Sequence, residues 1–144
     1  MRLPIRVPAT AGLAALTAAA CFAAEPALEP GLYEVEVRIA LPNVLNVAAP
    51  TIATRCLTAA DLQSGQGFSV LSDNPLKNCP LLDYHATADS AVYRIVCPGP
   101  NMGHAVGVFE LAPTTFRGTI KMNMGGKNMT MSETQRGRRT GDCP

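Results

Sequence analysis

Residues 114–131 read TTFRGTIKMNMGGKNMTM and carry the clearest secondary-structure pattern in the chain. From Thr114 to Met124, small or apolar residues alternate with polar ones, and a strand places alternate side chains on opposite faces. The first set comprises Thr114, Phe116, Gly118, Ile120, Met122 and Met124. Residues 125–128, GGKN, are typical of a turn, and the chain returns from Met129. The pattern therefore predicts a β-hairpin with one buried and one solvated face.

The same alternation recurs upstream of this hairpin. The further predicted strands are residues 31–41, 51–57, 79–87, 90–97 and 105–111. Thr58 is a suitable N-cap for one short helical turn, whereas residues 64–78 are rich in Gly, Ser, Asp, Asn and Pro and are typical of a loop. We predict an all-β fold, a single antiparallel meander sheet of about five to seven strands with that one helical turn. Such a sheet has to hide its edges and its apolar face, so we expect it to be strongly curved or partly closed.

The N-terminus has the pattern of an export signal. Arg2 and Arg6 precede residues 7–24, which contain no charge and consist mainly of Ala and Leu. A membrane-spanning helix needs about 20 strongly apolar residues, so we expect cleavage rather than a transmembrane span. The sequence predicts a signal peptide at residues 1–24 and one periplasmic or secreted β domain at residues 25–144. The alternative is lipoprotein processing, with an acyl anchor on Cys21.

Four cysteines follow the signal, namely Cys56, Cys79, Cys97 and Cys143. An even number of cysteines in a short exported chain is typical of disulfide bonds. A two-residue loop at Ala88-Asp89 would bring Cys79 within one position of Cys97, which leaves Cys56 for Cys143. Three pairings are possible in principle. A metal site made of four free thiols is the competing interpretation, although the chain has no CxxC spacing.

The charge balance argues against one class of partner. The chain has 12 Lys and Arg against 11 Asp and Glu, and two of the arginines belong to the signal, which leaves residues 25–144 at −1. A nucleic-acid-binding domain is normally basic, so we expect no nucleic acid partner. Arg136, Arg138 and Arg139 cluster near the C-terminus. This cluster is either a solvated strand end or a docking patch for an anionic headgroup or an acidic partner.

Met122, Met124, Met129 and Met131 flank the turn at residues 125–128 and are predicted to line one face of the hairpin. Three interpretations are open. The methionines continue the face of Phe116 and Ile120, so they are core residues in the simplest interpretation. They are alternatively a pliable apolar groove for a lipid or a protein segment. Thioethers also favour Cu(I), for which His104 would be a further ligand.

The sequence contains no motif for a known catalytic site. We find no GxSxG, HExxH, P-loop or GxGxxG pattern. Asp83 and His85 share one strand face and would suit a base with its orienting partner in a hydrolase, or a plain surface pair. We therefore expect no enzyme activity, no catalytic residues and, apart from the Cu(I) alternative, no cofactor.

Several segments resemble one protein family. They are residues 29–35 (EPGLYEV), 56–58 (CLT), 116–118 (FRG) and 137–143 (GRRTGDC), together with the two central cysteines. These segments resemble family 3617 of domains of unknown function, which consists of small exported bacterial proteins. Tyr33 departs from the family, in which Trp is frequent at that position. The resemblance implies export, disulfides and a small, mostly β domain, and it implies no established activity or functional residues.

The sequence thus predicts a non-enzymatic exported domain that binds an apolar ligand, an envelope component or a protein partner, and that is a monomer. The expected ligand face comprises Phe116, Ile120, Met122, Met124, Met129 and Met131. The alternative function is periplasmic Cu(I) binding by the four methionines and His104.

Overall fold

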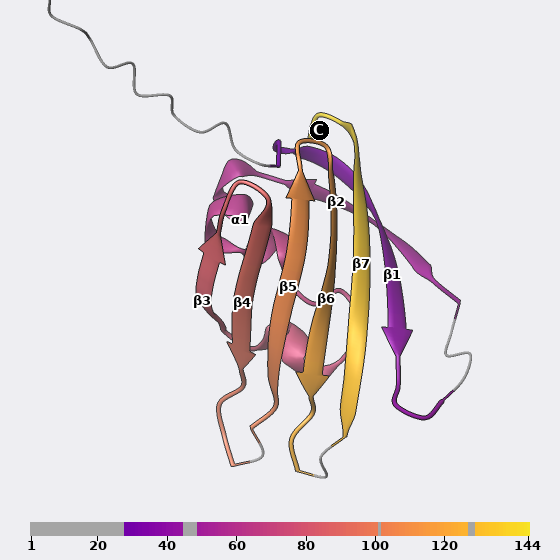
Figure 1. The fold of residues 1–144 in the computed structure, drawn as a ribbon, viewed down its shortest axis with the longest axis vertical. Coiled ribbons are helices and arrows are strands. Elements are labelled where there is room, and N and C mark those ends of the chain that lie inside the picture. Colours follow the sequence, from indigo (N-terminus) through magenta and orange to yellow (C-terminus); the bar gives the residue numbers. More distant parts are fainter. Residues whose placement is uncertain (1–27, 45–48, 101, 127–128) are drawn as a thin grey trace, which may run out of the picture.

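Seven antiparallel strands form one twisted sheet in the computed structural model (Figure 1). The structure describes residues 28–44, 49–100, 102–126 and 129–144, so the expected signal peptide and Cys21 lie outside it. The strands are β1 (Gly31–Ala40), β2 (Thr51–Leu57), β3 (Leu81–Ala86), β4 (Ser90–Val96), β5 (His104–Ala112), β6 (Thr115–Asn123) and β7 (Thr130–Gly141). Their order is β2-β1-β7-β6-β5-β4-β3. The predicted all-β fold is confirmed, and the sheet is open because β2 and β3 are its edges and do not pair.

The connection between β2 and β3 covers the inner face of the sheet. It contains α1 (Ala59–Ser64) and two short 3₁₀ helices, η1 (Gln66–Phe68) and η2 (Pro75–Asn78). Phe68, Val70 and Leu76 of this connection are each 1% exposed and belong to the core. We call residues 58–78 the cover segment. The loop expected at residues 64–78 therefore supplies core residues and packs on the sheet. No helix in the described part of the chain is long and apolar enough to span a membrane.

A capping box starts the cover segment, as expected from Thr58. The Thr58 hydroxyl accepts a hydrogen bond from the Asp61 amide at 3.1 Å, and the Asp61 carboxylate accepts one from the Thr58 amide at 2.9 Å. Hydrogen bonds from the Thr58 side chain and backbone lower the pKa of Asp61, so this carboxylate stays charged at the positive end of the helix dipole. Gly65, with φ +79°, then ends the helix in the left-handed conformation.

Three aromatic rings of the inner face each cover a glycine on the next strand. The directly opposed pairs are Tyr93 with Gly107, Phe109 with Gly118, and Phe116 with Gly137. A Cβ atom on these glycines would lie 2.3, 2.2 and 2.1 Å, respectively, from the opposing ring. The rings thus lie flat across β5, β6 and β7, and we call this arrangement the aromatic staircase. Phe68 of the cover segment packs on it, with ring centroids 4.9 Å from Phe109 and 5.4 Å from Phe116.

Both predicted disulfides are present. Without a bulge, the predicted hairpin would leave Cys79 and Cys97 one position out of register. A β-bulge between Leu82 and His85 shifts the β3–β4 register by one residue and brings the two cysteines opposite each other. Their Cα atoms are 4.9 Å apart. The second bond joins Cys56 to Cys143, with Cα atoms 5.3 Å apart, and links β2 to the C-terminal tail. By loop entropy alone the two bonds stabilise the fold by roughly 3 and 4.5 kcal/mol.

Substitution of Gly118 by Ala tests the aromatic staircase. The new methyl group would overlap the Phe109 ring, and overpacking of this kind costs about 2–3 kcal/mol. We expect the melting temperature to fall by about 10 °C in a thermal unfolding experiment followed by circular dichroism. Gly141→Ala is the matched control, because a Cβ there meets nothing within 4 Å. Equal melting temperatures for the two variants would contradict the staircase.

Candidate functional site

The methionine pairs form in the predicted register, but most of their face is hydrophobic core. Met122 opposes Met131, and the Met124 amide donates to the Met129 carbonyl at 2.8 Å, so the turn has four residues. Met122 is 2% exposed, and Phe116 and Ile120, from the same expected ligand face, are 4% and 0% exposed. Met124 and Met131 are half-buried against the core, and only Met129 is open to solvent, at 60%. Phe116, Ile120 and Met122 are therefore core residues, whereas Met129 is the exposed end of the expected ligand face.

The structure also separates the expected Cu(I) ligands. His104 is exposed and pairs with Asn123, whereas its buried neighbour Ala105 pairs with Met122. Because directly opposed residues share a face, His104 lies on the outer face of the sheet and Met122 on the inner face. His104 therefore does not join the methionines. Among the described residues, no group of three or more His, Cys, Asp and Glu is placed to hold a metal ion.

Asp83 and His85 share the outer face, and the hydrogen-bond partner of the Asp83 carboxylate is Arg94. The Asp83 carboxylate accepts a hydrogen bond from Arg94 Nε at 2.7 Å, and both side chains of this ion pair are mostly exposed. His85 opposes the exposed Val92 beyond the bulge. Asp83 thus orients Arg94 rather than an imidazole, and the pair is a surface feature of the edge strand.

The C-terminal arginine cluster is largely neutralised by its neighbours. Arg138 forms an ion pair with Glu34 at 3.4 Å, and Arg139 forms one with Asp142 at 2.5 Å. Arg139 Nε also donates to the Pro30 carbonyl at 3.0 Å. Two of the three arginines therefore hold the ends of β1 and β7 together, which favours the interpretation as a solvated strand end.

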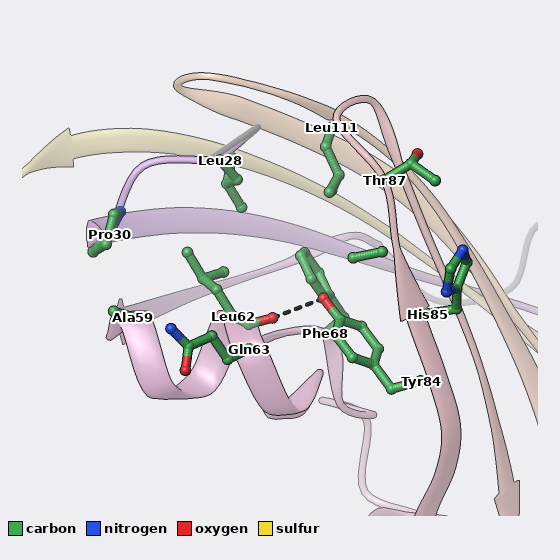
Figure 2. Close-up of a pocket in the computed structure, with 11 residues that line it drawn as sticks. Leu28, Pro30, Ala59, Leu62, Gln63, Phe68, Tyr84, His85, Thr87 and Leu111 are labelled. Atoms are coloured by element: carbon green, nitrogen blue, oxygen red, sulfur yellow. Dashed lines mark hydrogen bonds between the residues drawn. The ribbon is translucent and has the colours of Figure 1, made fainter. Parts of the chain in front are cut away.

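An apolar pocket of about 510 Å³ lies between α1 and the inner side of the sheet, next to the β3–β4 hairpin (Figure 2). Its lining residues are Leu28, Pro30, Ala59, Leu62, Gln63, Phe68, Tyr84, His85, Ala86, Thr87 and Leu111. None of these carries a carboxylate, an ammonium or a guanidinium group. Phe68 and Leu28 are 1% and 3% exposed and form the floor, whereas Gln63, His85 and Thr87 lie at the exposed mouth. The pocket therefore suits an uncharged apolar group.

The helix side of the pocket is fixed by Tyr84. Its hydroxyl donates to the Leu62 carbonyl at 2.7 Å (dashed line in Figure 2), which ties the end of α1 to β3. Burial raises the pKa of Tyr84, so the phenol stays protonated and remains a donor. Gly65 allows the close approach, since a Cβ there would lie 2.5 Å from the Tyr84 ring.

The opposite rim of the pocket, at Pro30, is held by three hydrogen bonds of residues 29 and 30. The Glu29 amide donates to the Pro113 carbonyl at 2.8 Å, and Tyr33 Oη donates to the Glu29 carbonyl at 2.7 Å. The third is the bond from Arg139 to Pro30. Both walls are therefore preformed, and a ligand would not have to order them on binding.

Buried polar groups of β4 and β7 position the floor of the pocket. Glu133 and Gln135 are polar, but both side chains are 0% exposed and lie in the core. Gln135 Nε2 donates to the Ser69 carbonyl at 2.9 Å, and Tyr93 Oη donates to the Phe68 carbonyl at 2.5 Å. Burial, and secondly the charge of Glu133, raise the pKa of Tyr93, so this phenol also stays a donor.

Glu133 is the strongest of these anchors. Its carboxylate accepts hydrogen bonds from the amides of Leu71 and Ser72, both at 2.9 Å, from the Ser72 hydroxyl, and from Gln135 Nε2 at 2.6 Å. Four donors compensate the desolvation of one buried charge, which would be strongly destabilising if unpaired. The sequence analysis missed this residue. The signal was present, because the two-residue period that turns Met131 towards the core also turns Glu133 and Gln135 inwards.

The fold and site define a disulfide-linked, single-sheet β domain in which a helical cover segment encloses a small apolar pocket. Residues 28–143 match the model of the family described as "Protein of unknown function (DUF3617)", and the chain belongs to this family. The resemblance of the short segments is thereby confirmed. No curated protein and no solved structure matches the chain.

Substitution of Glu133 by Gln tests the anchor of the cover segment. An amide has one acceptor oxygen, so its NH₂ group would face either the Leu71 amide or the Ser72 amide and hydroxyl. We expect a loss of about 3 kcal/mol in the free energy of unfolding, measured by denaturant titration. Glu110→Gln is the control, because its ion pair with Arg117 is exposed and contributes about 1 kcal/mol or less. A variant at position 133 as stable as this control would contradict the anchor.

Proposed function

We propose that this protein is a non-enzymatic, exported domain that binds a small apolar ligand in the pocket between α1 and the β3–β4 hairpin. The observation that carries the proposal is the pocket itself, which is preformed, uncharged and floored by Phe68 and Leu28. Its volume of about 510 Å³ lies within the range of roughly 300–1,000 Å³ that is usual for small-molecule sites.

The chemistry of the lining supports an uncharged, chain-like or compact apolar ligand. Two polar groups of the lining already have partners, since Tyr84 Oη donates to Leu62 and the Thr87 hydroxyl contacts Asp89 and Ser90, and the other two polar side chains, Gln63 and His85, lie at the exposed mouth. A ligand would therefore gain affinity from burial of apolar surface rather than from hydrogen bonds. The same satisfied groups offer no activated nucleophile, which supports a binding role over catalysis.

The compartment proposed for this binding is the periplasm or the exterior of the cell. Two disulfides are typical of an oxidising environment, and residues 1–24 have the pattern of an export signal. A hydrophobic component of the cell envelope, or an apolar group of a protein partner, is the kind of ligand that such a compartment supplies.

Binding of the uncharged fluorescent probe N-phenyl-1-naphthylamine tests the proposal. The chain has no Trp, so the fluorescence gain of the probe is read without background energy transfer from that residue. Ala86→Phe would fill the pocket from β3, and we expect it to weaken probe binding about tenfold or more, because a ring would occupy space that the probe needs.

Ala112→Phe is the matched control, since Ala112 is also an exposed strand residue but does not line this pocket. We expect the wild type to bind the probe and the Ala112 variant to retain this binding. We also expect 1-decanol to displace the probe. A wild-type protein that binds no probe, or an Ala86 variant that binds it unchanged, would refute the proposed function.

A further inference from the structure

The two edges of the sheet differ in how well they are protected against pairing with a further strand. β3 carries the β-bulge between Leu82 and His85, and Asp83 within the bulge has a φ of +52°. A bulge of this kind twists an edge away from a flat partner strand. β2, in contrast, pairs with β1 over seven consecutive residues without a register shift. β2 is therefore the regular edge, and the monomer expected from the sequence leaves it unpaired.

The residues of β2 also favour pairing with a further strand. The strand reads TIATRCL, without proline or glycine, and it contains three β-branched residues, Thr51, Ile52 and Thr54. Its one charged residue is Arg55, which opposes the buried Tyr33 and therefore lies on the inner face. There the Arg55 guanidinium donates to the Ser69 hydroxyl at 3.2 Å, so the cover segment holds this charge. The strand thus lacks the proline, bulge or free lysine that usually blocks an edge.

The main chain of β2 is fixed and its outer edge is free. Within the described part of the chain, residues 51–57 form no backbone hydrogen bond outside their ladder with β1. The disulfide between Cys56 and Cys143 ties the end of the strand to the C-terminal tail. An edge strand with a row of free N–H and C=O groups is a template for the addition of another strand. Because this template is preformed, an added strand would not have to order it.

We propose that β2 pairs antiparallel with β2 of a second copy of this chain, with a two-fold axis through Thr54. Directly opposed residues lie on the same face of a sheet, so inner residues have to oppose inner residues and outer residues outer ones. The register centred on Thr54 meets this condition and pairs all seven residues of the strand. It places Ala53 opposite the partner's Arg55, and Ile52 opposite the partner's Cys56. The two sheets then form one continuous sheet, with both cover segments on the same side.

A second copy suits this edge because β2 is complementary to itself in that register. The long side chain of Arg55 faces a small alanine, whereas a register centred on Arg55 would oppose two guanidinium groups, which is destabilising. Thr54 faces its own copy, and cross-strand threonine pairs are favourable. Ile52, which is 60% exposed, gains an apolar neighbour beside the disulfide of the partner. Such an isologous contact closes at the dimer, and the bulge of β3 opposes growth from the other edge.

Charge complementation at the axis tests the dimer. Protein purified after export, with Cys21→Ser in every version to exclude acylation, is studied by sedimentation from about 10 µM to about 1 mM, because a single strand pair is a small interface and the dimer is expected to be reversible. Thr54→Lys and Thr54→Glu each place two like charges opposite each other at the axis. We expect each variant alone to self-associate about tenfold or more weakly than the parent. An equal mixture of the two is expected to regain parental association, because a lysine then faces a glutamate.

Thr119→Lys and Thr119→Glu are the matched controls. Thr119 precedes the buried Ile120 and therefore lies on the outer face of the central strand β6, away from both edges. We expect both control variants to dimerise like the parent. A parent that stays monomeric up to the highest concentration would overturn the proposal, as would equal losses in the controls. Loss of association in the Thr54 variants that mixing does not restore would also overturn it. No residue of β2 lines the pocket beside α1, so the dimer and the proposed ligand binding stand or fall separately.

Discussion

The structure depends on the close approach of aromatic rings to glycines across three neighbouring strand pairs. Each ring occupies the space above a glycine, where the side chain of any other residue would lie. The inner face of β4–β7 therefore has no side chain projecting beyond the rings at these glycines, and a single cover segment is sufficient to cover it. A core without tryptophan thereby obtains large rings from Tyr93, Phe109 and Phe116, and the ring of Phe68 packs against the last two. Because Phe68 is also the floor of the apolar pocket, the packing of the sheet and the shape of the pocket are set by the same contacts.

Buried polar groups give the cover segment a single position. Apolar packing alone would allow the segment to slide, whereas Glu133 accepts hydrogen bonds from the amides of Leu71 and Ser72, and Gln135 donates one to the Ser69 carbonyl, all at fixed positions of the backbone. The hydroxyl groups of Tyr84 and Tyr93 fix the cover segment in the same way, because they donate hydrogen bonds to the backbone carbonyls of Leu62 and Phe68. Directional bonds therefore fix the helix wall and the floor of the apolar pocket, and the proposed ligand would not have to reorganise them.

The sequence predicted those features that depend on local periodicity and spacing. The strands, the Thr58 cap and the disulfide pairing follow from alternation, turn residues and cysteine positions, and the structure confirms them. The sequence left the methionine face open among three interpretations, of which core packing was the simplest, because alternation shows that Met122 faces the core side but not whether another segment covers it. The side of the sheet on which His104 lies also did not follow from the sequence, because it depends on the register between β5 and β6. The pocket was missed because its lining comes from five separate parts of the chain, and only the tertiary fold brings them together.

A methyl NMR titration with 1-decanol tests the proposed binding site most directly. The leucine methyl groups of Leu28, Leu62 and Leu111 line the pocket, whereas the ε-methyl groups of Met122 and Met131 report on the hairpin face. We predict saturable shifts of the three leucines with the two methionines unchanged. Shifts of the methionines alone, or no saturable shift at any of the five, would contradict an apolar ligand site between α1 and the β3–β4 hairpin.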